Sequence, residues 1–156
     1  EGRQALAVKN PIMKIPMLED EELMVYDSAI IFRYIQQKLS LPPLTWQQEN
    51  TLTMINAVND SLVELMICIR SSIDINADKM LFNFKHKRID SVLGMLNDQV
   101  ASGEFSQWDY PAMCLFALLD WMEFREFKQY IAYPALVNFL LENKQQPRVH
   151  DTNPRL

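Results

Sequence analysis

The sequence predicts a mainly helical protein that opens with a short α/β segment and continues as an all-α bundle. Only 3 of its 156 residues are glycine, and from about residue 46 apolar residues recur at three- and four-residue intervals, the spacing of one helix face. Pro42-Pro43 interrupts the pattern and blocks helix formation. We therefore expect an amino-terminal segment at 1–39, a linker at 40–45 and a helical domain at 46–156.

The amino-terminal segment is expected to form a hairpin and one helix. Strand-like runs at 14–19 and 23–26 are separated by acidic residues. Asp27 and Ser28 are good N-caps before an apolar periodic run, and the helix should end near Leu39. Because a two-stranded hairpin is only marginally stable, we expect it either to pack against the helical bundle or to pair with further strands upstream.

Four helices are expected in the second domain. Apolar stripes at 55–69 and 89–100 predict two long amphipathic helices. At 112–127 apolar residues surround the helix axis, which predicts a helix buried on all sides at the centre of the bundle. The last helix begins at Pro134, a favoured first-turn residue, and is followed by a polar tail at 143–156.

Composition argues against several classes of partner. With 15 basic and 20 acidic residues the net charge is -5, and no Lys/Arg-rich run indicates a nucleic-acid partner. The longest apolar stretch, 111–119, is too short to span a bilayer and no signal peptide is visible, so we expect a cytoplasmic protein without a membrane partner. His86 and His150 lack companions at metal-ligand spacing, so no metal is expected. Cys68 and Cys114 lie in apolar helical patterns typical of buried thiols.

One group of residues predicts a peptide-binding site. Pro16 stands at a strand start, where its missing N–H is tolerated, and a cis bond there would turn the backbone of Ile15 outward. Such an edge can pair with an extended peptide, and the helix opening at Ser28 offers N–H groups to a carboxylate. Asp27 is placed to receive an amino group. Singly, each feature has an ordinary structural explanation; together they predict a site for a short peptide with both groups at one end.

A second motif opens the most apolar helix. Ser106 and Asp109 have the spacing of N-cap and N3 in a capping box, with Phe105 and Tyr110 as the hydrophobic staple. We interpret this motif as structural and not catalytic. Pro111 lacks the N–H needed in the first full turn, which predicts a slight kink.

Together these motifs resemble the cytosolic glutathione transferases of bacterial type. In that family an Asn-Pro, a Lys/Gln-Val/Ile-Pro strand and a Glu/Asp-Ser pair form the second half of a thioredoxin-like domain. The residues that resemble this pattern here are Asn10-Pro11, Lys14-Ile15-Pro16 and Asp27-Ser28. A Ser-x-x-Asp capping box likewise opens the family's buried helix. The resemblance implies that 1–39 is the carboxyl-terminal half of the glutathione-binding domain and 46–156 the complete helical domain.

The resemblance also implies roles for single residues. Ile15 would pair through its backbone with the cysteinyl unit of glutathione, with Pro16 cis. Asp27 and Ser28 would bind the γ-glutamyl end, and Lys14 would lie near the glycyl carboxylate. Some family members contact glutathione of the neighbouring subunit through an acidic residue of the first long helix, here Asp60, although a solvent-facing acid is the commoner case.

The implied activity is conjugation of glutathione, as co-substrate, to a small hydrophobic electrophile by a homodimer, a detoxification reaction. The family's thiol-activating Tyr, Ser or Cys lies on an opening βαβ unit of about 30 or more residues, whereas only nine residues precede Asn10. We therefore expect an amino-terminally incomplete chain whose catalytic residue is unknown. Two alternatives are a non-catalytic protein-interaction module of the same fold and a glutathione-dependent thiol reductase.

Overall fold

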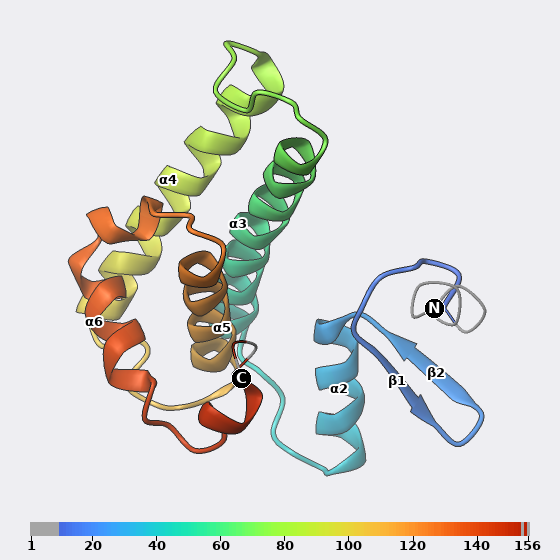
Figure 1. Ribbon diagram of the computed structural model, residues 1–156. Coiled ribbons are helices and arrows are strands. Elements are labelled where there is room, and N and C mark those ends of the chain that lie inside the picture. The colour runs from blue at the N-terminus through green and yellow to red at the C-terminus, as the bar shows by residue number, and fades with distance from the viewer. Residues whose placement is uncertain (1–9, 154, 156) are drawn as a thin grey trace. The chain divides into compact units, whose positions relative to one another are not determined.

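The computed structural model describes residues 10–153 and residue 155, and the chain divides into two compact units, 1–44 and 45–156. In unit 1 an antiparallel pair of strands precedes one helix, and unit 2 is all-helical (Figure 1). The elements of unit 1 are β1 (Met17–Asp20), β2 (Leu23–Tyr26) and α2 (Ser28–Lys38). Those of unit 2 are α3 (Trp46–Arg70), α4 (Met80–Ala101), α5 (Tyr110–Phe124), η1 (Gln129–Ala132), α6 (Pro134–Asn143) and η2 (His150–Thr152). The predicted fold class is confirmed.

Unit 1 is tied together by its hairpin and by polar contacts. The register pairs Met17 with Tyr26 and Asp20 with Leu23, so a two-residue turn joins the strands. Asp20 then accepts hydrogen bonds from the Tyr34 hydroxyl at 2.6 Å and from the Lys38 ammonium, which attach α2 to the end of β1.

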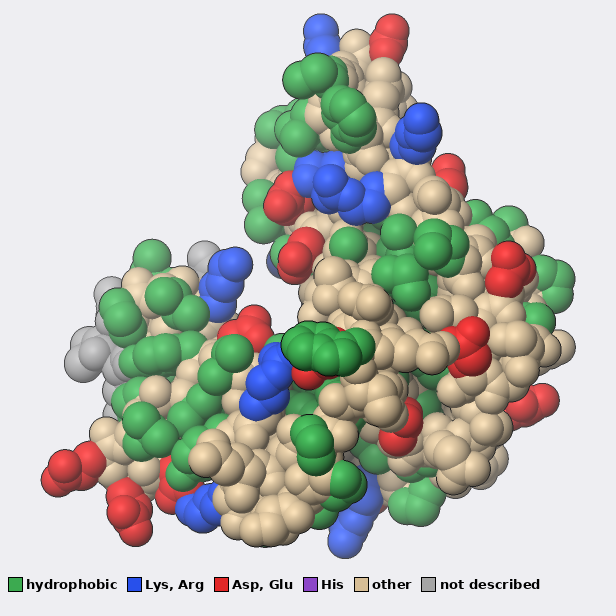
Figure 2. Space-filling model, turned by 180° about the vertical axis from the view of Figure 1, so that it is seen from behind, with side chains coloured by type: hydrophobic (Ala, Val, Ile, Leu, Met, Phe, Trp, Pro, Cys, Tyr) green, Lys and Arg blue, Asp and Glu red, His purple; other side chains and the backbone are tan. Residues whose placement is uncertain are grey.

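The apolar surface of unit 1 is largely exposed. Among its described residues Val25 is the one buried apolar side chain, and α2 buries none. Hydrophobic side chains accordingly cover much of the smaller lobe in Figure 2. The hydrophobic residues of unit 1 that are about half exposed or more include Ile12, Met13, Ile15, Leu23, Ile30 and Leu39. Unit 1 therefore relies on hydrogen bonds and capping more than unit 2 does.

Unit 2 is built on a conventional apolar core. Its fully buried side chains are Val58, Leu62, Leu65, Ile89, Leu93, Leu96, Ala112, Leu115, Leu119, Met122 and Leu136. Each buried leucine or isoleucine contributes roughly 1.5–3 kcal/mol relative to its exposure to water. By length and composition α3 is also apolar enough to span a bilayer, but its apolar stripe at 55–65 is buried in this bundle.

The start of α5 differs from the prediction. Asp109, not Ser106, is the N-cap, and its side chain accepts a hydrogen bond from the Ala112 N–H at 3.1 Å. The physical reason is Pro111, which would leave a gap in the second turn of a helix capped by Ser106. In a helix that begins at Tyr110, Pro111 lies in the first turn, where no N–H is needed. The predicted capping box is therefore wrong, and the reason for expecting a kink at Pro111 no longer applies.

The predicted hydrophobic staple is wrong for the same reason. With Asp109 as N-cap, the positions before the cap and in the fourth helical place belong to Trp108 and Met113 instead of Phe105 and Tyr110. The ring of Phe105 packs edge-to-face on Phe139 of α6, with centroids 5.7 Å apart. Phe105 thus joins the loop before α5 to α6 of the bundle.

One stripe of α5 also corrects the prediction of a helix buried on all sides. Met113 is 43% exposed, Ala117 is exposed, and Asp120 and Trp121 are only half-buried. These residues follow each other at intervals of three and four, so they share one face of the helix. That face lines a cavity described below.

Candidate functional site

The hairpin register brings two predicted site segments to the same place. Met17 and Tyr26 are paired at the open end of the hairpin. Pro16, which precedes Met17, and Asp27, which follows Tyr26, are therefore at neighbouring strand ends, and paired strands lie about 4.8 Å apart. The Ile15–Pro16 segment and the start of α2 thus both adjoin the open end of the hairpin.

A buried asparagine shapes the approach to this edge. Asn10 is fully buried, and its side-chain oxygen accepts a hydrogen bond from the Ile12 N–H at 3.1 Å. Its carbonyl accepts from the Met13 N–H at 3.0 Å, and its side-chain amide donates to the Lys14 carbonyl. Asn10 therefore satisfies the polar groups of this turn by itself and fixes the path of the chain into β1.

The three residues that lead into β1 are exposed, and the peptide bond that the resemblance implied to be cis lies among them. The Ile15–Pro16 peptide bond is cis. Ile15 is 79% exposed, and Lys14 and Pro16 are exposed as well. These residues precede β1, which begins at Met17. An extended peptide can reach their polar groups by strand addition.

Asp27 holds the start of α2 in an unusual conformation. Its backbone has φ 73° and ψ 137°, a region that costs a non-glycine residue of order 1–3 kcal/mol and is concentrated at functional sites. Its side chain accepts from the Ala29 N–H at 2.9 Å, and its carbonyl from the Ile31 N–H at 2.9 Å. The exposed carboxylate has about four lone-pair sites and can accept further donors.

Ser28 is exposed and is the first residue of α2. The first backbone N–H groups of a helix point outward and carry a partial positive charge, which favours a bound carboxylate. Asp27 and Ser28 therefore put an acceptor for an amino group directly beside a site for a carboxylate.

Asp60 lies in the other unit, on an exposed position of α3. Its contact with glutathione of a neighbouring subunit stays a prediction. Among the residues of 10–153 and 155, no group of three or more His, Cys, Asp or Glu side chains is close enough to hold a metal ion.

Sequence reasoning missed one group of residues in unit 2. The sequence predicts a polar tail at 143–156, yet Arg155 reaches Asp120 of α5 with hydrogen bonds of 2.9 Å. An acidic residue within a strongly apolar helix was the visible signal, but its partner is 35 residues away and no local spacing identifies it.

Known proteins are similar to this chain in sequence over residues 1–37 and in structure over nearly its whole length. Residues 1–37 match the family model of the glutathione S-transferase N-terminal domain, whereas no curated protein matches. A glutathione transferase family member from Pseudomonas fluorescens Pf-5, solved with bound glutathione, has a TM-score of 0.82 and 21% identity over 98% of this chain and 80% of that chain. A second structure from that organism, with bound S-(propanoic acid)-glutathione, has a TM-score of 0.78 and 20% identity over 94% and 80%.

A glutathione S-transferase from Methylobacillus flagellatus KT, solved with glutathione bound, has a TM-score of 0.78 and 18% identity over 96% of this chain and 80% of that chain. At such identities the likeness establishes the fold, and function has to be argued from the site. Residues 1–37 thus match the glutathione S-transferase N-terminal domain, and the chain has the fold of these solved glutathione transferases, which confirms its resemblance to that family.

Proposed function

We propose that this chain acts as a cytoplasmic glutathione transferase, a homodimer that joins the glutathione thiolate to small hydrophobic electrophiles. The observation that carries the proposal is the hairpin register, because the exposed residue Ile15 with its cis bond to Pro16, and Asp27 with Ser28, adjoin the paired strand ends Met17 and Tyr26. A γ-glutamyl tripeptide has complementary groups at matching positions. The fold neighbours solved with glutathione add support.

In the proposed complex each part of unit 1 takes one part of glutathione. The Asp27 carboxylate receives the α-amino group, and the N-terminus of α2 at Ser28 receives the α-carboxylate. The backbone of Ile15 pairs with the cysteinyl unit, and Lys14 lies near the glycyl carboxylate. These contacts hold the tripeptide by both ends and leave its thiol at the middle.

The proposed reaction needs glutathione as a thiolate. The sulfur attacks the electrophilic carbon, a C–S bond forms, the leaving group departs with the bonding electrons, and the thiol proton passes to solvent. A hydrogen-bond donor or a positive local field must lower the thiol pKa for this step. By the resemblance, that donor is a Tyr, Ser or Cys upstream of Asn10.

Calorimetric titration of the full chain with glutathione tests the site. Asp27→Asn keeps a good N-cap that tolerates positive φ but removes the negative charge, so we expect at least tenfold weaker binding. Glu22→Gln removes an exposed carboxylate from the hairpin turn of the same unit and should bind as the wild type does. Equal loss in both variants, or in neither, contradicts the proposed role of Asp27.

Assays of turnover and glutathione binding distinguish the transferase from the two alternatives, a thiol reductase and a non-catalytic protein-interaction module. Conjugation of glutathione to an aryl halide by the full-length protein supports the transferase, and reduction of a mixed disulfide supports a thiol reductase instead. Absence of any glutathione binding favours a protein-interaction module. Light scattering tests the dimer, and Asp60→Ala should weaken glutathione binding only if Asp60 reaches the partner subunit's site.

A further inference from the structure

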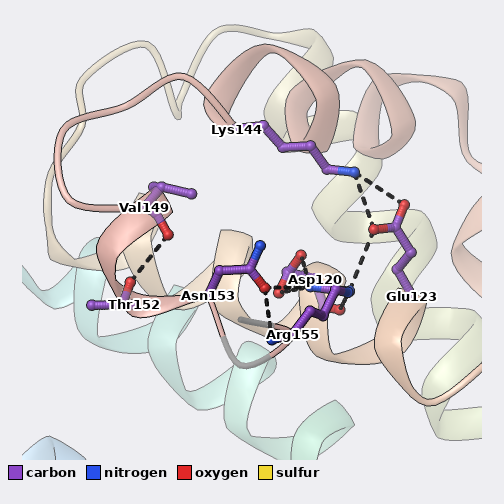
Figure 3. A network of polar contacts seen from close by, with 7 residues as sticks. All are labelled: Asp120, Glu123, Lys144, Val149, Thr152, Asn153 and Arg155. Carbon is purple, nitrogen blue, oxygen red and sulfur yellow. Dashed lines mark hydrogen bonds and ion pairs between the residues drawn. The ribbon is translucent and has the colours of Figure 1, made fainter.

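A cavity of about 730 Å³ lies in unit 2 between the half-exposed face of α5 and the segment 144–155. This volume is within the range of small-molecule sites, roughly 300–1,000 Å³. The lining residues that Figure 3 labels come from both sides, with Asp120 and Glu123 on α5 and Lys144, Val149 and Arg155 on the segment. The cavity is therefore formed by tertiary structure and not by one loop.

Its apolar wall is aromatic and held in place by other rings. Trp108 packs edge-to-face on Phe116, with centroids 5.7 Å apart and planes at 73°. Trp121 stacks on Phe127 at 5.8 Å and 26°. Rings that are already fixed lose little conformational entropy when a ligand binds, and Met113 beside them can adapt to its shape. A flat, apolar ligand fits such a wall.

The two carboxylates that line the cavity, those of Asp120 and Glu123, already accept hydrogen bonds from cationic side chains. Both oxygens of Asp120 accept from Arg155 Nη1 at 2.9 Å. Both oxygens of Glu123 accept from Lys144 Nζ, at 3.2 and 3.0 Å, and Arg155 Nη2 reaches Glu123 at 3.4 Å (Figure 3). Neither carboxylate is therefore well placed to bind a cationic ligand.

Cationic hydrogen-bond donors, by contrast, outnumber the carboxylates that line the cavity. Three cations, Lys144, Arg148 and Arg155, line the cavity against two carboxylates. Arg148 pairs with Asp151 at 3.2 Å, but the two side chains are 86% and 58% exposed, and such pairs contribute only about 0–1 kcal/mol. Since a guanidinium has five N–H donors, Arg148 can turn to an incoming acceptor at little cost.

We propose that this cavity binds a small planar aromatic acid, with its ring against Trp108 and Trp121 and its acidic group at Arg148. Every lining residue belongs to unit 2, whereas the residues assigned to glutathione of the same subunit lie in unit 1, and Asp60, assigned to glutathione of the neighbouring subunit, does not line the cavity. The inference thus goes beyond glutathione binding and stands without it.

The tryptophans themselves report on occupancy. The chain has three, of which Trp46 is 86% exposed and does not line the cavity. In a Trp46→Phe chain all tryptophan emission comes from the cavity wall. We expect 2-naphthoate to change this emission with saturation, and its neutral isostere 2-naphthamide to bind at least threefold more weakly. Calorimetry with the same chain checks the stoichiometry.

Two variants test the location. Ala117→Phe adds a ring to an exposed position that lines the cavity and should weaken 2-naphthoate at least tenfold. Ala101→Phe adds the same ring at the exposed end of α4 and should change nothing. Arg148→Gln should weaken 2-naphthoate several-fold and leave 2-naphthamide unaffected.

Unsaturable emission changes, or equal affinity of the Ala117→Phe and Ala101→Phe chains, would overturn the site. Equal effects of Arg148→Gln on acid and amide would overturn the assignment of the acidic group. Urea unfolding of each variant confirms that the chain is folded when it is titrated.

Discussion

Arg155 binds Asp120 through three hydrogen bonds of 2.9 Å, two from Nη1 to the carboxylate oxygens and one from Nη2 to the backbone carbonyl. Its guanidinium carbon also lies 5.1 Å from the ring centroid of Phe124. The Asp120 side chain is 17% exposed and that of Arg155 30%, so water screens this pair less than a fully exposed one. One contact thereby anchors the carboxyl-terminal segment to α5.

Arg155→Gln should loosen that segment. The substitution leaves the half-buried carboxylate of Asp120 without its cationic partner, and we expect a loss of about 1–2 kcal/mol in the free energy of unfolding. Hydrogen exchange followed by mass spectrometry should show faster exchange at 147–153. Arg148→Gln breaks only the exposed pair with Asp151 and should leave exchange and stability within about 0.5 kcal/mol of the wild type. Similar exchange in the two variants would contradict the anchoring role.

The corrected start of α5 gives a second prediction. Asp109→Ala removes the cap of Ala112 and the hydrogen bond of 2.9 Å from the Gln48 side chain, and should cost about 1–2 kcal/mol in urea unfolding. Ser106 is exposed and lies outside the helix, so Ser106→Ala should cost less than about 0.5 kcal/mol. A capping box spanning Ser106 and Asp109 would make both substitutions harmful, and that result would restore the motif.

The same helix shows why the sequence predicted some elements better than others. Apolar periodicity identified α3, α4 and α6, because burial of one face governs such helices. At α5 two local signals disagreed, since the Ser-x-x-Asp spacing favoured a start at Ser106 and Pro111 favoured a later one. Proline has no N–H to donate in any conformation, whereas a capping motif only favours one helix start over another. The helix therefore begins at Tyr110, where Pro111 lies in the first turn.

The proposed glutathione site and the cavity of unit 2 also differ in how far the sequence predicts them. The residues of unit 1 assigned to glutathione lie within 14–28, and the hairpin register puts Pro16 and Asp27 at neighbouring strand ends, so the sequence could predict which residues would form the proposed site. The cavity of unit 2 collects residues from 108 to 155. Its two walls meet through the contact of Arg155 with Asp120, which depends on the path of the chain after α6 and has no local signature.

Asp20 should give unit 1 a pH dependence. Hydrogen bonds from Lys38 first, and from Tyr34 second, hold the pKa of the Asp20 carboxyl below its ordinary value. Because the pKa is lowered on folding, the stabilisation is present above the ordinary carboxyl pKa of about 3.9 and is lost as pH falls through the lower value. Carboxyl NMR titration should show the low pKa, and Lys38→Gln should raise it more than Tyr34→Phe does. An Asp20 that titrates as a free carboxyl in the wild type would refute the tie between β1 and α2.

Cys114 should be an unreactive thiol at neutral pH. The pKa of Cys114 is raised to about 11: burial raises it most, a hydrogen bond with Tyr110 lowers it, and the negative charge of Asp109 raises it by a smaller amount. At pH 8 only about one thiol in a thousand is then the reactive thiolate. In a Cys68→Ser chain, alkylation by iodoacetamide should be very slow and should accelerate about tenfold per pH unit until the pKa is approached.

The neighbours of Cys114 supply the controls for this measurement. Tyr110→Phe should raise the thiol pKa, since it removes the opposing hydrogen bond. Asp109→Asn should lower it, since it removes the charge and leaves a competent N-cap. An alkylation midpoint near pH 8.5, the value of a free cysteine, would show that the thiol is open to solvent. With the raised pKa, Cys114 does not supply a thiolate at neutral pH, so thiol reductase activity would have to come from another cysteine.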